Sequence, residues 1–136
     1  TDFPNDRTAG MEGVVAIPHL GASTEESEDN CAIMAVRQVI DYLENGNIKN
    51  SVNFPNCDMG VCTKPGRILV LHKNIPNTIG RFTTKLANYN INISDMLNRS
   101  KGDYAVTMLD LDEPTPIAAA KELEKLEGVF RVRVIR

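Results

Sequence analysis

The chain has 136 residues, enough for one ordinary domain or for a small domain joined to part of another. Its 15 basic and 18 acidic residues give a net charge of −3, and 42% of its residues are hydrophobic, which argues against nucleic-acid binding and against disorder. No apolar stretch approaches the roughly 20 residues of a membrane-spanning helix. The opening residues show neither an initiator Met nor a signal-peptide pattern, so we expect a piece of a longer protein.

Three cysteines, Cys31, Cys57 and Cys62, indicate no disulfide framework, because their number is odd and their spacing fits no common zinc motif. We expect free thiols and a cytoplasmic location, and the sequence assigns these thiols no role. His19 and His72 are the only imidazoles, so we predict no metal site.

Residues 14–17 form a short apolar run that predicts a buried strand. A long helix is expected over 24–44, because Ser23 lies three residues before Glu26, as in a capping box, and Gly46 ends the pattern. This helix has a broad apolar stripe that needs cover on more than one side, so we expect self-association or exchange of the helix between copies. The stripe includes Ile33, Val36, Ile40 and Leu43.

Residues 55–66 contain two Pro and two Gly, which favours a linker. The sequence therefore predicts a first section over 1–54, the linker over 55–66 and a second section over 67–136.

The second section alternates strands and helices. Strands are predicted over 67–72, 91–98, 104–111 and 129–135, and helices over 77–89 and 115–127, with a five-residue hairpin loop over 99–103. The order β-α-β-β-α-β predicts an α+β, ferredoxin-like fold with both helices on one face of the sheet. Because the first strand is apolar on both faces, the other face needs cover from a copy of the chain or another domain.

The turn after the first of these strands is a candidate ligand site. His72 and Asn74 lie there beside backbone N–H groups that we expect to be unpaired, and together they could hold a small amino acid. The alternative is an ordinary loop in which Asn77 caps the next helix.

Two further polar residues are candidates. Asn92 begins an expected edge strand, where a partner chain could approach, or where it could simply discourage aggregation. His19 could exchange a proton with an alcohol or carbonyl near neutral pH, or could be an ordinary hydrogen-bonded surface residue.

Two segments resemble known families. Residues 17–26, Ile-Pro-His-Leu-Gly-Ala-Ser-Thr-Glu-Glu, resemble the catalytic-histidine segment of NAD-dependent D-2-hydroxyacid dehydrogenases. The chain down to residues 51–55 is similar to the helix and return strand that end the catalytic part of those enzymes. Residues 65–136 resemble an ACT domain, a small regulatory module that binds amino acids. The resemblance implies a strand–helix–strand tail of an α/β catalytic domain, followed by a βαββαβ ACT domain.

The dehydrogenase resemblance implies that His19 is the catalytic histidine of a parent oxidoreductase that uses NAD. Family members with one ACT domain oxidise 3-phosphoglycerate in the first step of L-serine biosynthesis. The partner glutamate, the substrate arginine and the glycine-rich cofactor loop would lie upstream, since Gly10 and Gly13 do not make GxGxxG. We therefore expect this chain alone to be inactive.

The ACT resemblance implies side-by-side pairing of two domains, with L-serine or another small amino acid at their interface for feedback control. His72 and Asn74 of one chain and Asn92 of the other match the binding positions. Many ACT domains have Gly where this chain has Asn77, so the ligand could differ. A purely structural oligomerisation module, or a related ACT-bearing 2-hydroxyacid dehydrogenase with another substrate, are the alternatives; neither nucleic acid nor membrane is an expected partner.

Overall fold

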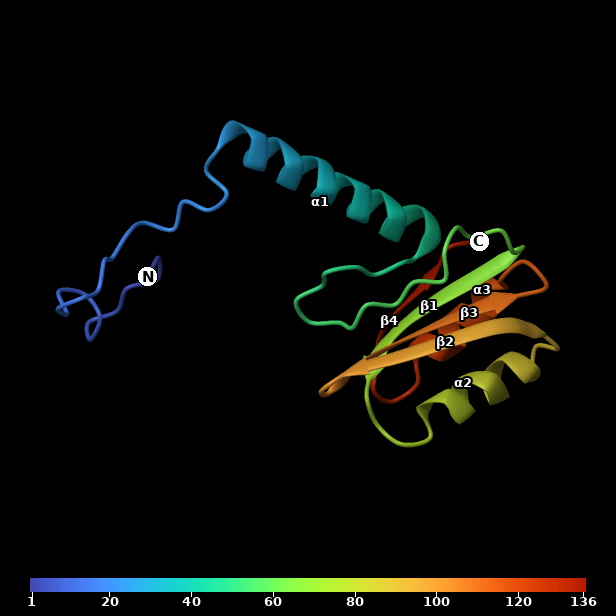
Figure 1. The fold of residues 1–136 in the computed structure, drawn as a ribbon. Helices are drawn as coiled ribbons and strands as arrows, with labels where there is room; N and C mark the ends of the chain where they lie inside the picture. Colours follow the sequence, from blue (N-terminus) through green and yellow to red (C-terminus); the bar gives the residue numbers. More distant parts are fainter. The chain divides into compact units, whose positions relative to one another are not determined.

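The computed structural model describes residues 1–136, which divide into two compact units, Thr1–Arg37 and Gln38–Arg136. None of the helices is long and apolar enough to cross a membrane. The elements in chain order are α1 (Glu25–Asn45), β1 (Gly66–Lys73), α2 (Thr78–Ala87), β2 (Ile93–Lys101), β3 (Tyr104–Leu111), α3 (Ile117–Glu124) and β4 (Val129–Val134) (Figure 1).

The four strands form one antiparallel sheet in the order β2-β3-β1-β4. Helix α2 joins β1 to β2 and α3 joins β3 to β4, so the chain order is βαββαβ. This confirms the predicted ferredoxin-like α+β fold. Both helices pack on the same face of the sheet, as Figure 1 shows. We call this the helix-side face; β2 and β4 are the edge strands.

The helix-side face carries the larger hydrophobic core. Phe82 of α2 and Leu123 of α3 are fully buried against alternate residues of the two central strands. Side chains alternate along a strand, so every second residue of β1 and β3 faces these helices. The strand residues of this core are Ile68, Val70, Leu109, Leu111 and Val132.

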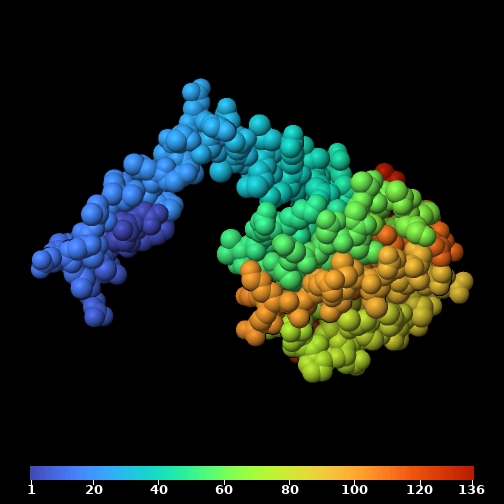
Figure 2. All heavy atoms as spheres, in the orientation of Figure 1, coloured from blue at the N-terminus to red at the C-terminus, as the bar shows by residue number.

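The opposite face of the sheet is covered by residues 47–60, which we call the cover segment. Ile48 and Cys57 form an isolated antiparallel bridge and pack with Leu69, Val106 and Met108 of the sheet. In Figure 2 the green atoms of this segment lie against the orange atoms of the β2–β3 hairpin. The sequence predicted that a copy or another domain would cover this face; in the structure the chain provides the cover itself.

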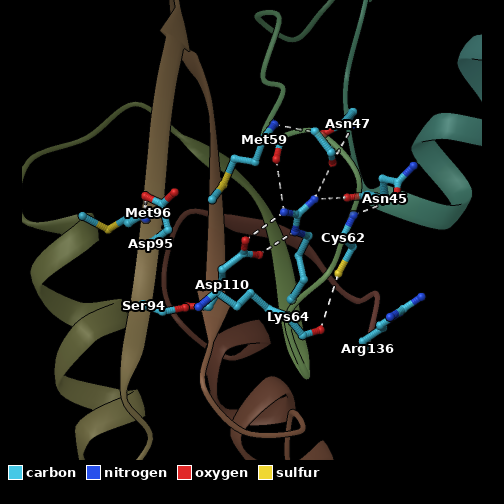
Figure 3. A network of polar contacts seen from close by, with 12 residues as sticks. Asn45, Asn47, Met59, Cys62, Lys64, Ser94, Asp95, Met96, Asp110 and Arg136 are labelled. Atoms are coloured by element: carbon cyan, nitrogen blue, oxygen red, sulfur yellow. Dashed lines mark hydrogen bonds and ion pairs between the residues drawn. The ribbon is translucent and has the colours of Figure 1, made fainter.

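Arg67 of β1 holds the cover segment to the sheet. Its side chain is 1% exposed and forms a bidentate ion pair with Asp110 of β3, in which Nη2 lies 2.8 Å from Oδ2. The other N–H groups of the guanidinium donate to the backbone oxygens of Asn45, Gly60 and Met59 (Figure 3). The hydrogen-bonded carboxylate raises the pKa of Arg67, so the buried guanidinium stays charged.

A buried amide completes the attachment. Asn47 is 3% exposed, and its Nδ2 donates to Asp41 and to the carbonyl oxygen of Gly60, while its Oδ1 accepts from the backbone N–H of Met59. Part of the segment predicted as a linker is therefore bonded to the sheet domain. The predicted domain boundaries, at 54/55 and 66/67, stay a proposal.

Two short strands that were expected from the sequence are not formed. Residues 14–17 have no strand partner in their unit, and Val15 and Ile17 are 75% and 52% exposed, so that strand prediction is wrong. Residues 51–55 also lack a return strand, because the cover segment is held by side-chain bonds and one bridge instead of a ladder. At the start of α1, Thr24, rather than Ser23, accepts from the N–H of Ser27 at 3.2 Å.

The long helix agrees with its predicted range, and none of its residues is buried. The predicted five-residue hairpin loop is wrong, because Lys101 pairs with Tyr104 and only two residues form the turn. Gly102, with φ +59°, supplies the left-handed backbone that so tight a turn requires.

Candidate functional site

His72 lies near the end of β1 and points into the helix-side core. Its side chain is 2% exposed, and its ring meets Phe82 edge-on at a centroid distance of 5.1 Å. Nδ1 lies 2.8 Å from the carbonyl oxygen of Lys73, and Nε2 lies 2.8 Å from Oγ1 of Thr107. Both ring nitrogens are engaged, so a ligand can bond to His72 only by replacing one of these partners.

Thr107 extends the contact across the sheet. Its hydroxyl also lies 2.8 Å from Oδ1 of Asn98, a half-buried residue on the edge strand β2. We call the chain His72–Thr107–Asn98 the histidine relay. Burial lowers the pKa of His72, and so does the nearby charge of Arg81, whereas the oxygens of Lys73 and Asn98 raise it; burial is the largest effect.

Asn74 hydrogen-bonds the turn after β1 to the β2–β3 hairpin. Its backbone N–H donates to the carbonyl oxygen of Asp103, and its Nδ2 donates to that of Gly102 at 3.1 Å. The expectation of unpaired backbone N–H groups at this turn is wrong for residues 73–75, because all three donate within the chain. At the start of α2, which follows this turn, no side-chain cap engages the first backbone N–H groups.

A surface hollow of about 360 Å³ adjoins Asn74. Lys73 and Asp103 line it with charges of opposite sign, and the rings of Tyr104 and Phe130 form its apolar part. The ion pairs of the chain involve other residues, so both charges are free to meet a ligand. Sequence reasoning missed Lys73 and Asp103, because only the two-residue turn brings Asp103 back beside the end of β1.

Asn77 precedes α2 with φ +62°, in the left-handed region, and makes no capping bond with its side chain. The alternative in which Asn77 caps the helix is therefore wrong. Its backbone conformation is one that Gly adopts readily and Asn tolerates, so the exchange of Gly for Asn keeps the turn and adds a side chain.

Asn92 is exposed just before β2, where its Nδ2 donates to Oδ2 of Asp112 and lowers the pKa of that carboxyl. Strands β1 and β2 run in the same direction on either side of β3. The start of β2 is therefore at the other end of the sheet from the end of β1. The structure brings His72 and Asn74 to one end and leaves Asn92 at the other.

His19 is exposed in the first unit. Its Nδ1 lies 2.7 Å from Oδ2 of Asp2, and its ring stacks on Phe3 at a centroid distance of 4.4 Å. This contact leaves Nε2 of His19 without a hydrogen-bond partner in the chain. Asp2 was not singled out in the sequence, since nothing in its neighbours connects it to residue 19.

The residues of this chain do not fit a dinucleotide. Gly10 and Gly13 lie in turns with φ +83° and +79°, and a Cβ at either would meet nothing within 4 Å, so no packed strand–turn–helix cradle exists there. No three His, Cys, Asp or Glu side chains come together within metal-binding range.

The sheet order and the βαββαβ chain order define an α+β domain of the ferredoxin-like type, preceded by a long helix. Among solved structures, the ACT domain from GTP pyrophosphokinase of Chlorobium tepidum matches with a TM-score of 0.45 and 17% identity, over 51% of this chain and 94% of that one. No family model matches the chain.

The chain is a distant homologue of D-3-phosphoglycerate dehydrogenases. That of Haemophilus influenzae is 26% identical over 127 residues, which are 92% of this chain and 30% of the relative. D-3-phosphoglycerate dehydrogenase 1 of Saccharomyces cerevisiae is 29% identical over 74% of this chain and 22% of the relative. The chain thus spans less than a third of the length of these relatives.

Proposed function

We propose that this chain is the regulatory part of an NAD-dependent D-3-phosphoglycerate dehydrogenase, in the cytoplasm, and that two copies bind L-serine between their ACT domains. His72 and Asn74 of one copy and Asn92 of the other would form each site. Serine bridging the pair would favour one of two arrangements of the catalytic parts and so control the oxidation of 3-phosphoglycerate.

The observation that carries this proposal is the position of the site residues at opposite ends of one sheet. Antiparallel pairing of two copies along the edge strand β2 places the start of one β2 beside the end of the other. Asn92 of one copy then lies at the same end of the joined sheet as Asn74 of its partner. Because Asn74 and Asn92 lie at opposite ends of the sheet in one chain, they can meet at one ligand only if each comes from a different copy.

The hollow beside Asn74 supports an amino acid as the ligand. The ammonium of Lys73 suits a carboxylate, and the carboxylate of Asp103 suits an α-ammonium group. The side-chain oxygen of Asn74 can accept from the same ammonium, since only its Nδ2 is engaged. The two rings in the hollow also allow an amino acid larger than serine.

The test is a mixing experiment by calorimetry with L-serine. Asn74→Ala and Asn92→Ala should each lose the heat of binding, and both side chains are exposed, so folding should persist. When the two variants are mixed and re-paired, one intact site returns in each mixed pair, about a quarter of all sites. Asn53→Ala, an exposed Asn in the cover segment, is the matched control and should bind fully.

A site contained in one chain would show no recovery on mixing, which would refute the shared site. If the unmodified chain pairs in ultracentrifugation yet shows no heat with L-serine or larger amino acids, the sensor proposal is wrong. The second candidate, a purely structural pairing module, is then the better one. It is favoured by one observation: His72 already has partners for both ring nitrogens.

For the catalytic part, we expect His19 to serve as the proton-exchanging histidine of the parent enzyme. The chain alone should neither bind NAD stoichiometrically nor turn over 3-phosphoglycerate, because its residues do not fit the cofactor. Turnover by the pure 136-residue chain would overturn this expectation.

A further inference from the structure

The histidine relay has too few protons to keep one arrangement in both charge states of His72. The Thr107 hydroxyl has one proton, and in one arrangement it donates to Oδ1 of Asn98, 2.8 Å away. Nε2 of His72 must then donate to the Thr107 oxygen. Nδ1 faces a carbonyl oxygen, which only accepts, so it also carries a proton. This set of hydrogen-bond directions requires the charged, doubly protonated ring.

A neutral ring requires the opposite polarity. The carbonyl oxygen of Lys73 keeps the proton on Nδ1, so Nε2 becomes an acceptor and Thr107 must donate to it. The oxygens of Thr107 and Asn98 would then face each other at 2.8 Å with no proton between them. Rotation of the Asn98 amide by half a turn removes this repulsion, because Nδ2 can donate to Thr107.

We propose that the histidine relay is a two-state proton device, in which the charge of the buried His72 sets the orientation of the Asn98 amide on the edge strand β2. With the ring charged, Asn98 directs its oxygen to Thr107 and its NH₂ group outward. With the ring neutral, these two ends exchange. The change in ring charge on β1 thus alters a side chain on β2 through Thr107 of β3, and it requires only side-chain rotation.

The groups around the ring act on its charge in opposite directions. Charge on the ring is opposed by burial and by Arg81 of α2, and is favoured by the accepting oxygens. Phe82 of α2, Thr107 of β3 and Val129 of β4 contact or pair with His72 and are uncharged. No carboxylate is bonded to the ring, so a small change in its surroundings can shift the balance.

The histidine relay would connect ligand binding at the β1–α2 turn to the edge strand β2, where two copies would pair. This consequence rests on the proposed function. A ligand carboxylate near the β1–α2 turn favours the charged ring, and the relay then presents the NH₂ group of Asn98 at β2. Since β2 is the edge at which a second copy would pair, ligand binding and pairing are linked through one amide.

The experiment follows two signals by ¹⁵N NMR on the whole chain from about pH 8 down through the titration of His72, which burial places below that of a free imidazole. The chain has 2 histidines, so the ring of His72 is readily assigned. We expect the side-chain NH₂ signals of Asn98 to shift with the same midpoint as the His72 ring nitrogens. The buried amide of Asn47, bonded to Asp41 and Gly60, is the control and should not follow that midpoint.

Two variants of Thr107 distinguish an effect transmitted through its hydroxyl from a direct effect of the His72 charge on the Asn98 signals. Thr107→Val removes the hydroxyl at constant shape, so the Asn98 signals should lose their dependence on the ring. Thr107→Ser keeps the hydroxyl and should retain it. If Thr107→Val does not fold, the comparison of midpoints in the unmodified chain still decides.

Asn98 signals that stay constant while the ring titrates, or that still follow it in Thr107→Val, would overturn the proposal. None of these measurements contains a ligand, so the relay is judged independently of serine. Addition of L-serine near the midpoint tests the link: the Asn98 signals should move toward their acid form. Absence of binding would count against the proposed function alone.

Discussion

On its helix-side face the sheet is buried by two helices whose apolar residues recur at helical spacing. On the opposite face it is buried by the cover segment, which has one isolated bridge and no regular structure. The first face is joined almost entirely by apolar contacts. The second depends on the buried Arg67–Asp110 ion pair and on amide bonds from Asn47.

This difference teaches that a sheet face can be closed by polar bonds to an irregular segment when no amphipathic element is available. An irregular segment exposes its backbone groups, so burying it requires partners for them. Arg67 supplies several at once, because its planar guanidinium donates to a carboxylate and to backbone oxygens together.

The largest expected effect comes from removing this arginine. Arg67→Ala should lower the free energy of unfolding by about 3–5 kcal/mol, because it leaves Asp110 buried and unpaired. Urea unfolding of the chain measures the loss. Lys64→Ala, which removes the partly exposed pair with Asp112, is the control and should cost less than about 1 kcal/mol. Equal losses in the two variants would contradict the special role of Arg67.

On the helix-side face, Leu109→Ala should cost about 2–5 kcal/mol, because a fully buried side chain is deleted from a packed core. The loss should be global and should therefore lower the protection of every strand from hydrogen exchange. A loss confined to the helices would show that the core is not one cooperative unit.

On the opposite face, Ile48→Ala should loosen the cover segment more than the rest of the domain. Cys57 of that segment is buried against the sheet, and burial raises the pKa of its thiol to about 11, so it should react slowly with a thiol reagent in the unmodified chain. The variant should label faster at Cys57, whereas exposed Cys31 should label equally in both chains. An unchanged rate at Cys57 would mean that the two faces open together.

The smallest expected effect is a loss of stability of the cover segment at acidic pH. Burial works to raise the pKa of Asp41, but bonds from Asn45, Asn47 and Lys49 outweigh it and lower the pKa; Gly60 and Lys49 lower that of Asp58. Carboxyls with lowered pKa stabilise the folded state above their ordinary value of 3.8, and this stability is lost as pH falls below it. The N–H groups of the Ile48–Cys57 bridge should then exchange before those of β1 and β3. Simultaneous loss of protection would contradict this order.

Much of the fold was predictable, because periodicity reports directly on which side chains are buried. The βαββαβ order and the long helix follow from that pattern. The two absent strands, 14–17 and 51–55, show its limit: a segment becomes a strand only where a neighbouring strand pairs with it along a continuous ladder. For the site, His72, Asn74 and Asn92 were identified by resemblance, and their binding role stays a proposal.

The sequence by itself determined the order and type of the elements of the sheet domain, since each depends on spacing within a few residues. Only the tertiary structure decided that His72 is buried with both nitrogens engaged and that Thr107 and Asn98 continue from it. It also decided that Arg67 and Asp110, 43 residues apart, meet inside the domain. These contacts join residues distant in the chain through strand register, which local patterns do not encode.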